Sequence, residues 1–181
     1  MKKVASNNVT FQVKSEQPAG YNVTPSPVLH KIEEDAIIAR AWEIIQRRAR
    51  ATGSLLGNPD DVKQYLAIAN AQQHDQYRER FAVLFLDSQH CVIEYQVMFE
   101  GTLSSTTVYP REVCRKALAL NASAVILSHN HPSGVLTPSA ADETITQTLK
   151  SALSLVDVRV LDHIITAPNG SALSMAEKGM V

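Results

Sequence analysis

Two histidines and an aspartate within a short segment of the sequence could hold a metal ion. His129 and His131 are separated by one residue, so in an extended segment their side chains point to the same side. Asp142 follows at the expected start of a helix. Three protein ligands of the imidazole and carboxylate type, with a fourth position left to water, are typical of a catalytic zinc. The sequence therefore predicts a Zn²⁺ centre at His129, His131 and Asp142.

The elements around this segment would fix the ligands in place. The apolar run at residues 123–127 predicts a buried strand that delivers both histidines into a loop. Residues 132–138 contain two prolines and a glycine, which favour a fixed turn. Ser139 is a suitable N-cap for a helix over residues 139–155. Ser139 and Asp142 can also be interpreted as a capping box alone, although capping and metal binding are compatible.

The rest of the chain alternates between patterns typical of helices and of strands. Further helices are predicted at residues 33–50, 58–71 and 110–119, strands at 81–86, 91–99, 158–165 and 171–174, and a strand-prone segment at 102–108. We expect Ile37 on the apolar, inward face of the first of these helices and Leu118 on that of the last. This alternation predicts an α/β domain with a mixed sheet. We expect residues 1–30 to form a flexible or loosely docked arm, residues 31–56 an amphipathic helical extension, and residues 57–181 the domain that carries the site.

Composition excludes several classes of protein. The chain has 181 residues, of which 45% are hydrophobic and 19% charged, and its formal net charge is −1. This balance fits one globular domain with an extension and gives no bulk basic signal for nucleic acid. No apolar run is long enough to cross a membrane, and no secretory signal is evident. Cys91 and Cys114 are interpreted as reduced core thiols, which favours a cytoplasmic protein.

The spacing His129-x-His131, seven residues, Ser139, two residues, Asp142 resembles the JAMM signature of the MPN/JAB metallopeptidase superfamily. The bacterial RadC-type branch is the most similar, through HNHPSG at residues 129–134, PRE at 110–112 and LDHIIT at 161–166. The resemblance begins near residue 58 and lacks the helix-hairpin-helix region of full-length RadC-type proteins, so the chain resembles a short form. An HNH nuclease is rejected, because its residues are spread over a ββα unit.

The resemblance implies a fold, a reaction and further site residues. The fold would be MPN/JAB-like (cytidine deaminase-like), a mixed sheet flanked by helices with a helical N-terminal extension. The reaction would be zinc-dependent hydrolysis of peptide or isopeptide bonds, with a protein or peptide as substrate. Glu79, which lies in a RadC-like segment at residues 78–87, would be the general base, and Ser139 would hydrogen-bond the oxyanion. The rival bases are Glu94, Glu100 and Glu112, of which Glu100 is the strongest.

Two other functions remain open from the sequence. RadC-type proteins are associated with DNA repair and recombination, and a cluster of Arg47, Arg48 and Arg50 could contact phosphates. The dipole at a helix end is the favoured explanation of the same arginines. A non-catalytic scaffold ranks last, because such domains lack the ligands that are present here. The substrate's identity and the oligomeric state are not predicted.

Two neighbours of the ligands have open roles. Asn130, between the two histidines, should point away from the metal and tie down the loop. Asp162 and His163 lie on a predicted strand, where they could orient a ligand or form a satisfied buried pair.

Overall fold

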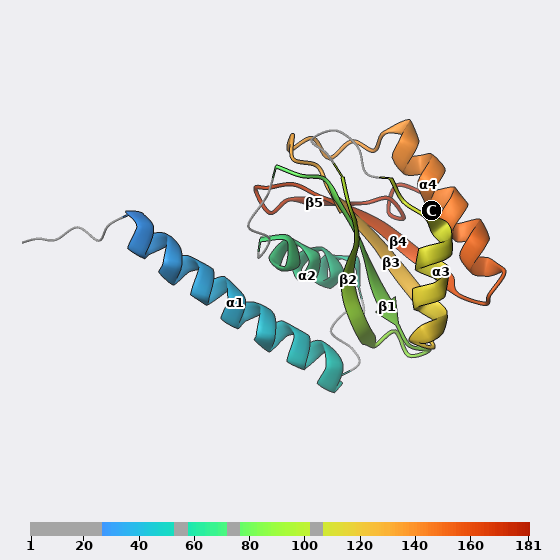
Figure 1. Ribbon diagram of the computed structural model, residues 1–181, viewed down its shortest axis with the longest axis horizontal. Helices are drawn as coiled ribbons and strands as arrows, with labels where there is room; N and C mark the ends of the chain where they lie inside the picture. Colours follow the sequence, from blue (N-terminus) through green and yellow to red (C-terminus); the bar gives the residue numbers. More distant parts are fainter. Residues whose placement is uncertain (1–26, 53–57, 72–76, 102–106) are drawn as a thin grey trace, which may run out of the picture.

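Five strands form one sheet in the computed structural model, which describes residues 27–52, 58–71, 77–101 and 107–181 (Figure 1). In these ranges the helices are α1 (Pro27–Thr52), α2 (Pro59–Ala71), α3 (Pro110–Ala119) and α4 (Ala140–Ser154). The strands are β1 (Arg80–Leu86), β2 (Val92–Glu100), β3 (Ala124–Asn130), β4 (Arg159–Thr166) and β5 (Ala172–Ser174). The predicted helices and strands of the domain are therefore confirmed within a few residues at each end.

The sheet has the order β2-β1-β3-β4-β5. Strands β3 and β4 are parallel and are connected through α4, whereas every other neighbouring pair is antiparallel. This arrangement is the mixed sheet that the sequence predicted. Strand β1 is buried along its whole length because it lies between β2 and β3 and because helices cover both of its faces.

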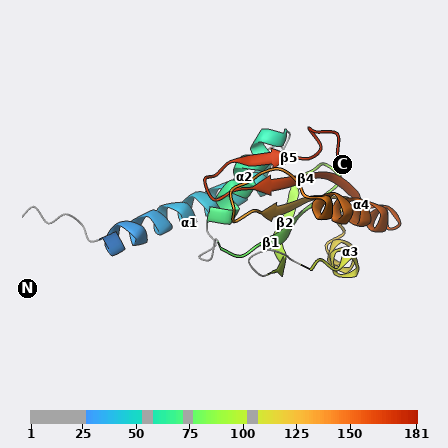
Figure 2. The same cartoon turned by 90° about the horizontal axis from the view of Figure 1, so that it is seen from above.

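Helices cover the two faces of the sheet and create two hydrophobic clusters (Figure 2). On one face, Phe81, Val83 and Phe85 of β1 pack with residues of α3 and α4. On the other face, Leu84 and Leu86 pack with residues of α2, and α1 adds partly buried side chains. Alternate residues of β1 thus enter different clusters, which explains why the strand is a continuous apolar run.

Helix α1 differs from its prediction at its start. It begins at Pro27, earlier than the expected residue 33, so the last residues of the predicted arm are helical. The indole ring of its Trp42 packs on Tyr65 and Tyr95, and its centroid lies 4.7 Å and 5.7 Å from the centroids of those two rings. Ile37, expected to face inward, is 69% exposed, because the first half of α1 projects beyond the sheet (Figure 1). Within the described residues, no helix is long and apolar enough to cross a membrane.

Three further expectations require correction or fall outside the described residues. Strand β3 continues to Asn130 because it pairs with β4 up to Thr166, so His129 lies on the strand and not in a loop. Leu118 was expected to face inward but is 55% exposed on the solvent side of α3. Residues 102–106 of the strand-prone segment lie outside the described residues, and 107–108 form no strand.

We predict that α4 is anchored by Leu149, whose side chain is fully buried against the sheet. Leu149→Ala should lower the free energy of unfolding by about 2–5 kcal/mol, because it removes apolar contacts and leaves a cavity. Leu155→Ala is the matched control, since Leu155 is 86% exposed at the end of the same helix, and its effect should stay within about 0.5 kcal/mol. Urea unfolding of both variants measures the difference, and equal effects would contradict the described packing of α4.

Candidate metal centre

Four side chains from separate parts of the chain converge at one end of the sheet. Glu79, His129, His131 and Asp142 each offer one ligand atom, and these atoms all lie within 4.8 Å of one another. The Nε2 atoms of His129 and His131 are 2.8 Å apart. Asp142 Oδ1 is 3.2 Å from His129 Nε2, and Asp142 Oδ2 is 3.6 Å from His131 Nε2. The structure thus brings together the three predicted ligands and the predicted base.

The backbone around the ligands explains their position. His129 is on β3, and His131 follows the strand with its backbone N–H donating to Thr166 O at 2.9 Å. The chain then turns through Gly134, whose φ of +79° favours glycine. The turn is closed by Gly134 N–H, which donates to His131 O at 3.0 Å. His131 is therefore held between the last residue of β4 and a tight turn.

Asp142 divides its two oxygens between the helix end and the histidines. Both Ser139 N–H and Ser139 Oγ–H donate to Asp142 Oδ2 at 2.7 Å, and Asp142 N–H donates back to Ser139 Oγ at 3.2 Å. This is the predicted capping box. Oδ1 stays directed at His129. Capping therefore fixes the carboxylate without removing it from the cluster, so the capping box leaves Asp142 available as a candidate ligand.

The chemistry of the donor atoms fits a zinc ion. His131 Nδ1 lies 2.5 Å from Val135 O, and a carbonyl can only accept, so the proton of a neutral His131 ring is on Nδ1 and Nε2 is left with a lone pair. That lone pair faces His129 Nε2 and the carboxylate. Ligands at about 2.0–2.1 Å from a tetrahedral zinc are roughly 3.3 Å apart. The observed separations of 2.8, 3.2 and 3.6 Å lie around that value.

Electrostatics in the cluster favour a cation. Burial acts to raise the pKa of Asp142, but hydrogen bonds from His129, His131 and Ser139 outweigh it and hold that pKa well below its ordinary value. The hydrogen bond to Asp142 raises the pKa of His131, although burial opposes this. Asp142 is therefore an anion next to two rings, and a positive charge between them, a proton or a metal ion, is stabilised.

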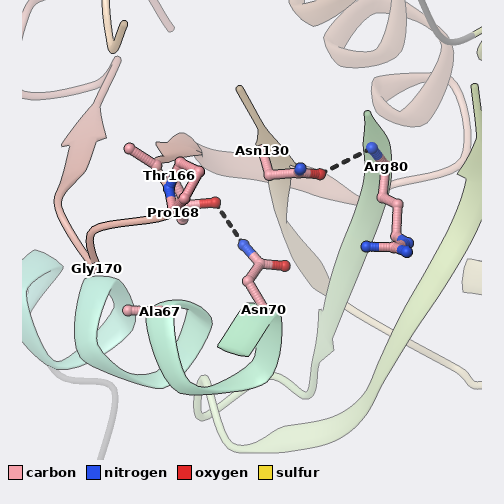
Figure 3. A pocket seen from close by; sticks show the side chains of 8 residues that line it. Ala67, Asn70, Arg80, Asn130, Thr166, Pro168 and Gly170 are labelled. Carbon is pink, nitrogen blue, oxygen red and sulfur yellow. Dashed lines mark hydrogen bonds between the residues drawn. The ribbon is translucent and has the colours of Figure 1, made fainter. Parts of the chain in front are cut away.

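The position of Glu79 depends on Asn130, which points to the opposite face of the sheet from the ligands. The Asn130 side chain accepts from Arg80 N–H at 2.8 Å (Figure 3). It also donates to Arg78 O at 3.0 Å, so it holds the backbone on both sides of Glu79. Glu79 O accepts from Gly101 N–H at 2.9 Å. The predicted orientation of Asn130 is confirmed, but its bonds hold the start of β1 instead of the metal loop.

The rival glutamates have other partners. Glu94 pairs with Lys116 at 2.9 Å, Glu100 with Arg80 at 3.2 Å, and Glu112 with Arg115 at 2.8 Å. Among the described residues, the cluster includes Glu79 and none of these three. The sequence left Glu100 as the strongest rival, and the structure directs its carboxylate to the guanidinium of Arg80.

A small cavity of about 60 Å³ lies behind the centre, on the face to which Asn130 points (Figure 3). Asn70 from α2 and Thr166 from β4 form a hydrogen bond at its wall, and the side chain of Arg80 lines it as well. The cavity and the metal cluster are therefore separated by the strand end of β3.

Asp162 and His163, which the sequence left with two interpretations, have different surroundings. Asp162 accepts from His163 N–H at 2.7 Å, Ser174 Oγ–H at 2.6 Å and Ala176 N–H at 2.9 Å, so it holds the C-terminal turn. His163 Nε2 lies 2.8 Å from His129 Nδ1. Thr146, which contacts His163, was not singled out from the sequence, although its place one helical turn after Asp142 puts both on one face of α4.

We predict that the centre binds about one zinc ion per chain and that the affinity falls as the pH is lowered. A protonated His131 cannot ligate, and its raised pKa means that protons already compete above its ordinary pKa of about 6.5. Elemental analysis of untagged protein should show the zinc, and His131→Ala should lose it. Chelator competition between about pH 6 and 8 measures the trend, and a pH-independent affinity would contradict it.

Comparisons with known proteins agree with this geometry. Residues 56–180 match the family described as RadC-like JAB domain. The chain is 50% identical over 149 residues to a UPF0758 protein of Methylibium petroleiphilum, covering 81% of this chain and 65% of that protein. It is 56% identical over 128 residues to a UPF0758 protein of Polaromonas sp., covering 71% of this chain and 55% of that protein.

A UPF0758 protein of Acidovorax sp. (strain JS42) is 57% identical over 124 residues, which are 68% of this chain and 50% of that protein. The chain thus spans between half and two thirds of the length of these curated relatives. The family match covers the whole sheet and all four residues of the cluster. The chain belongs to the RadC-like JAB domain family.

Proposed function

We propose that the protein is a zinc-dependent hydrolase of peptide or isopeptide bonds. The observation that carries the proposal is the convergence of Glu79 on His129, His131 and Asp142. Three ligands with a nearby carboxylate that need not ligate are what hydrolysis by an activated water requires. The family match supports a hydrolase of the JAMM type. The substrate would be a protein or peptide.

In the proposed mechanism, each residue has one task. His129, His131 and Asp142 would hold the zinc ion, which when bound polarises a water molecule and lowers its pKa to about 7. Glu79 takes a proton from the attacking water and passes it to the leaving amine. The carboxylate suits both steps, because it can accept the proton and then return it within hydrogen-bond reach.

Ser139 would stabilise the oxyanion of the tetrahedral intermediate. In the structure its hydroxyl donates to Asp142 Oδ2 at 2.7 Å, so it must turn toward the substrate for this task. The backbone N–H of Ser139 also donates to Oδ2 and keeps Asp142 in place when the hydroxyl turns. The two donors of this one residue would therefore serve the ligand and the reaction separately.

The DNA-associated alternative has weaker support. It rests on the association of RadC-type proteins with DNA repair. Its support in this sequence is the cluster Arg47, Arg48 and Arg50, which lies in the last turns of α1, where the helix dipole already accounts for positive charge. We therefore keep hydrolysis as the proposed function.

We predict that Glu79→Gln abolishes hydrolysis but keeps zinc. Because the amide cannot take the proton, the rate should fall by about 10²–10⁴-fold. The assay incubates the zinc-loaded protein with a mixture of unstructured peptides and lysine-linked isopeptides, and reads cleavage by mass spectrometry. Glu100→Gln is the matched control and should cleave like the wild type. Full activity in a zinc-loaded Glu79→Gln variant would exclude Glu79 as the base, and no cleavage by the wild type on any amide would oppose the proposal itself.

We also predict that Asn130→Asp slows hydrolysis without removing zinc. The substitution keeps the size of the side chain but replaces the donor to Arg78 O with a second acceptor, which loosens the backbone that carries Glu79. A base displaced by about 1 Å can lower the rate by roughly 100-fold. The turnover number should fall more than KM rises, with the zinc content unchanged. Loss of zinc instead would show that Asn130 supports the ligands and not the base.

A further inference from the structure

His163 is a buried titratable side chain that the proposed mechanism does not use. It lies on β4, its side chain is fully buried, and it is not among the candidate ligands. One ring nitrogen, Nε2, is 2.8 Å from His129 Nδ1, and the other, Nδ1, is 2.6 Å from Thr146 Oγ1. Thr146 is fully buried too, and its hydroxyl donates to Asp142 O at 2.5 Å. The chain of hydrogen bonds therefore starts at one ligand and ends at the backbone of another.

The last acceptor in this series of hydrogen bonds, Asp142 O, fixes the direction of every bond before it. The carbonyl of Asp142 can only accept, so the single hydroxyl proton of Thr146 points to it. Thr146 Oγ1 must then accept from His163, which places the proton of His163 on Nδ1. A neutral His163 is left with a lone pair on Nε2, which accepts from His129 Nδ1–H. The proton of His129 is thereby on Nδ1, and its Nε2 is free to ligate.

We propose that His163 and Thr146 are positioning residues that hold His129 in the tautomer able to bind the metal. The proposal rests on the metal site described above but not on the hydrolysis of any substrate. His131 obtains the same tautomer from Val135 O alone. The partner of His129 Nδ1 is the ring of His163, whose Nε2 can either donate or accept. A further partner of His163 is therefore needed to fix the direction of the bond between the two rings. Thr146 supplies it.

Helix α4 thereby supports the site in two ways. Asp142 contributes its carboxylate from the first turn, and its backbone carbonyl, through Thr146, sets the proton of a ligand on a different element. In α-helices a buried threonine hydroxyl commonly donates to the carbonyl four residues earlier. Here the bond uses the only proton of the Thr146 hydroxyl, so the lone pair of Oγ1 is left to accept from His163 Nδ1–H.

Removal of the hydroxyl should reverse the tautomers. In Thr146→Val, His163 Nδ1 loses its acceptor inside an apolar core, so the ring gains by carrying its proton on Nε2 and donating to His129 Nδ1. His129 would then carry its own proton on Nε2, where the metal binds. Zinc affinity should fall roughly 10- to 100-fold, the usual effect of removing a partner of a ligating histidine. Thr146→Ser keeps the hydroxyl and should restore the affinity.

The experiment uses untagged full chain and measures zinc and cobalt affinity by chelator competition for wild type, Thr146→Val, Thr146→Ser and Thr148→Val. Thr148→Val is the matched control, because Thr148 makes the same type of bond, to Thr144 O, on the exposed side of α4. Long-range proton–nitrogen NMR spectra of the histidine rings read the tautomers directly. We expect protons on Nδ1 of His129 and His163 in the wild type, weaker binding only in Thr146→Val, and rescue by serine.

Two results would overturn the proposal. One is a wild-type spectrum with the proton of His163 on Nε2, which can be read even if the valine variant does not fold. The other is a folded Thr146→Val variant with unchanged tautomers and zinc affinity. Neither measurement depends on catalysis. If the protons lie on Nδ1 of His129 and His163 but the protein cleaves no amide, the positioning role stands and only the proposed function is contradicted.

Discussion

The parallel pairing of β3 with β4 is the constraint on which the candidate centre depends. It carries β3 as far as Asn130, opposite Thr166, and so keeps His129 within a hydrogen-bonded ladder. It also places His163 beside His129, with ring centroids 4.8 Å apart. The connection between the two strands is α4, which supplies Asp142. One βαβ unit therefore provides all three candidate ligands and a buried partner, and the segment directly before β1 adds Glu79 from the other side of β3.

The sheet separates the candidate metal ligands on one face from the side chain on the other face that holds the backbone beside Glu79. Because side chains alternate along a strand, His129 faces Asp142 on α4, while its neighbour Asn130 faces the cavity beside Asn70 of α2. The two functions are thus assigned to consecutive residues without competition for space. Cores on both faces are needed for this arrangement, since a one-sided sheet would leave the Asn130 bonds exposed to water.

Much of this arrangement could be predicted from residue types and spacing. The strand–turn–helix signals around His129, His131 and Asp142 are local, and they place these elements to within a few residues. The resemblance to the RadC-type branch then indicated Glu79. Neither Thr146 nor the length of β3 could be derived, because both depend on pairing between distant segments: β3 is extended by its partner strand, and Thr146 acquires its role from a residue on β4. Ile37 was misplaced for a similar reason, since its exposure depends on how far α1 extends past the sheet.

The amide of Asn130 acts as one more rung of the ladder between β1 and β3, beyond the last backbone pair of Phe81 with His129. The first residue of β1, directly after Glu79, is thus attached to β3 by a side chain. Fraying of this connection to β3 would loosen the backbone beside Glu79, which Gly101 N–H still holds from the β2 side, while the candidate ligands stay assembled on β3 and α4. The proposed base and the candidate ligands therefore have separate structural supports in this domain. The hydrogen-exchange rate of one backbone amide, Arg80 N–H, reports on the first of them alone.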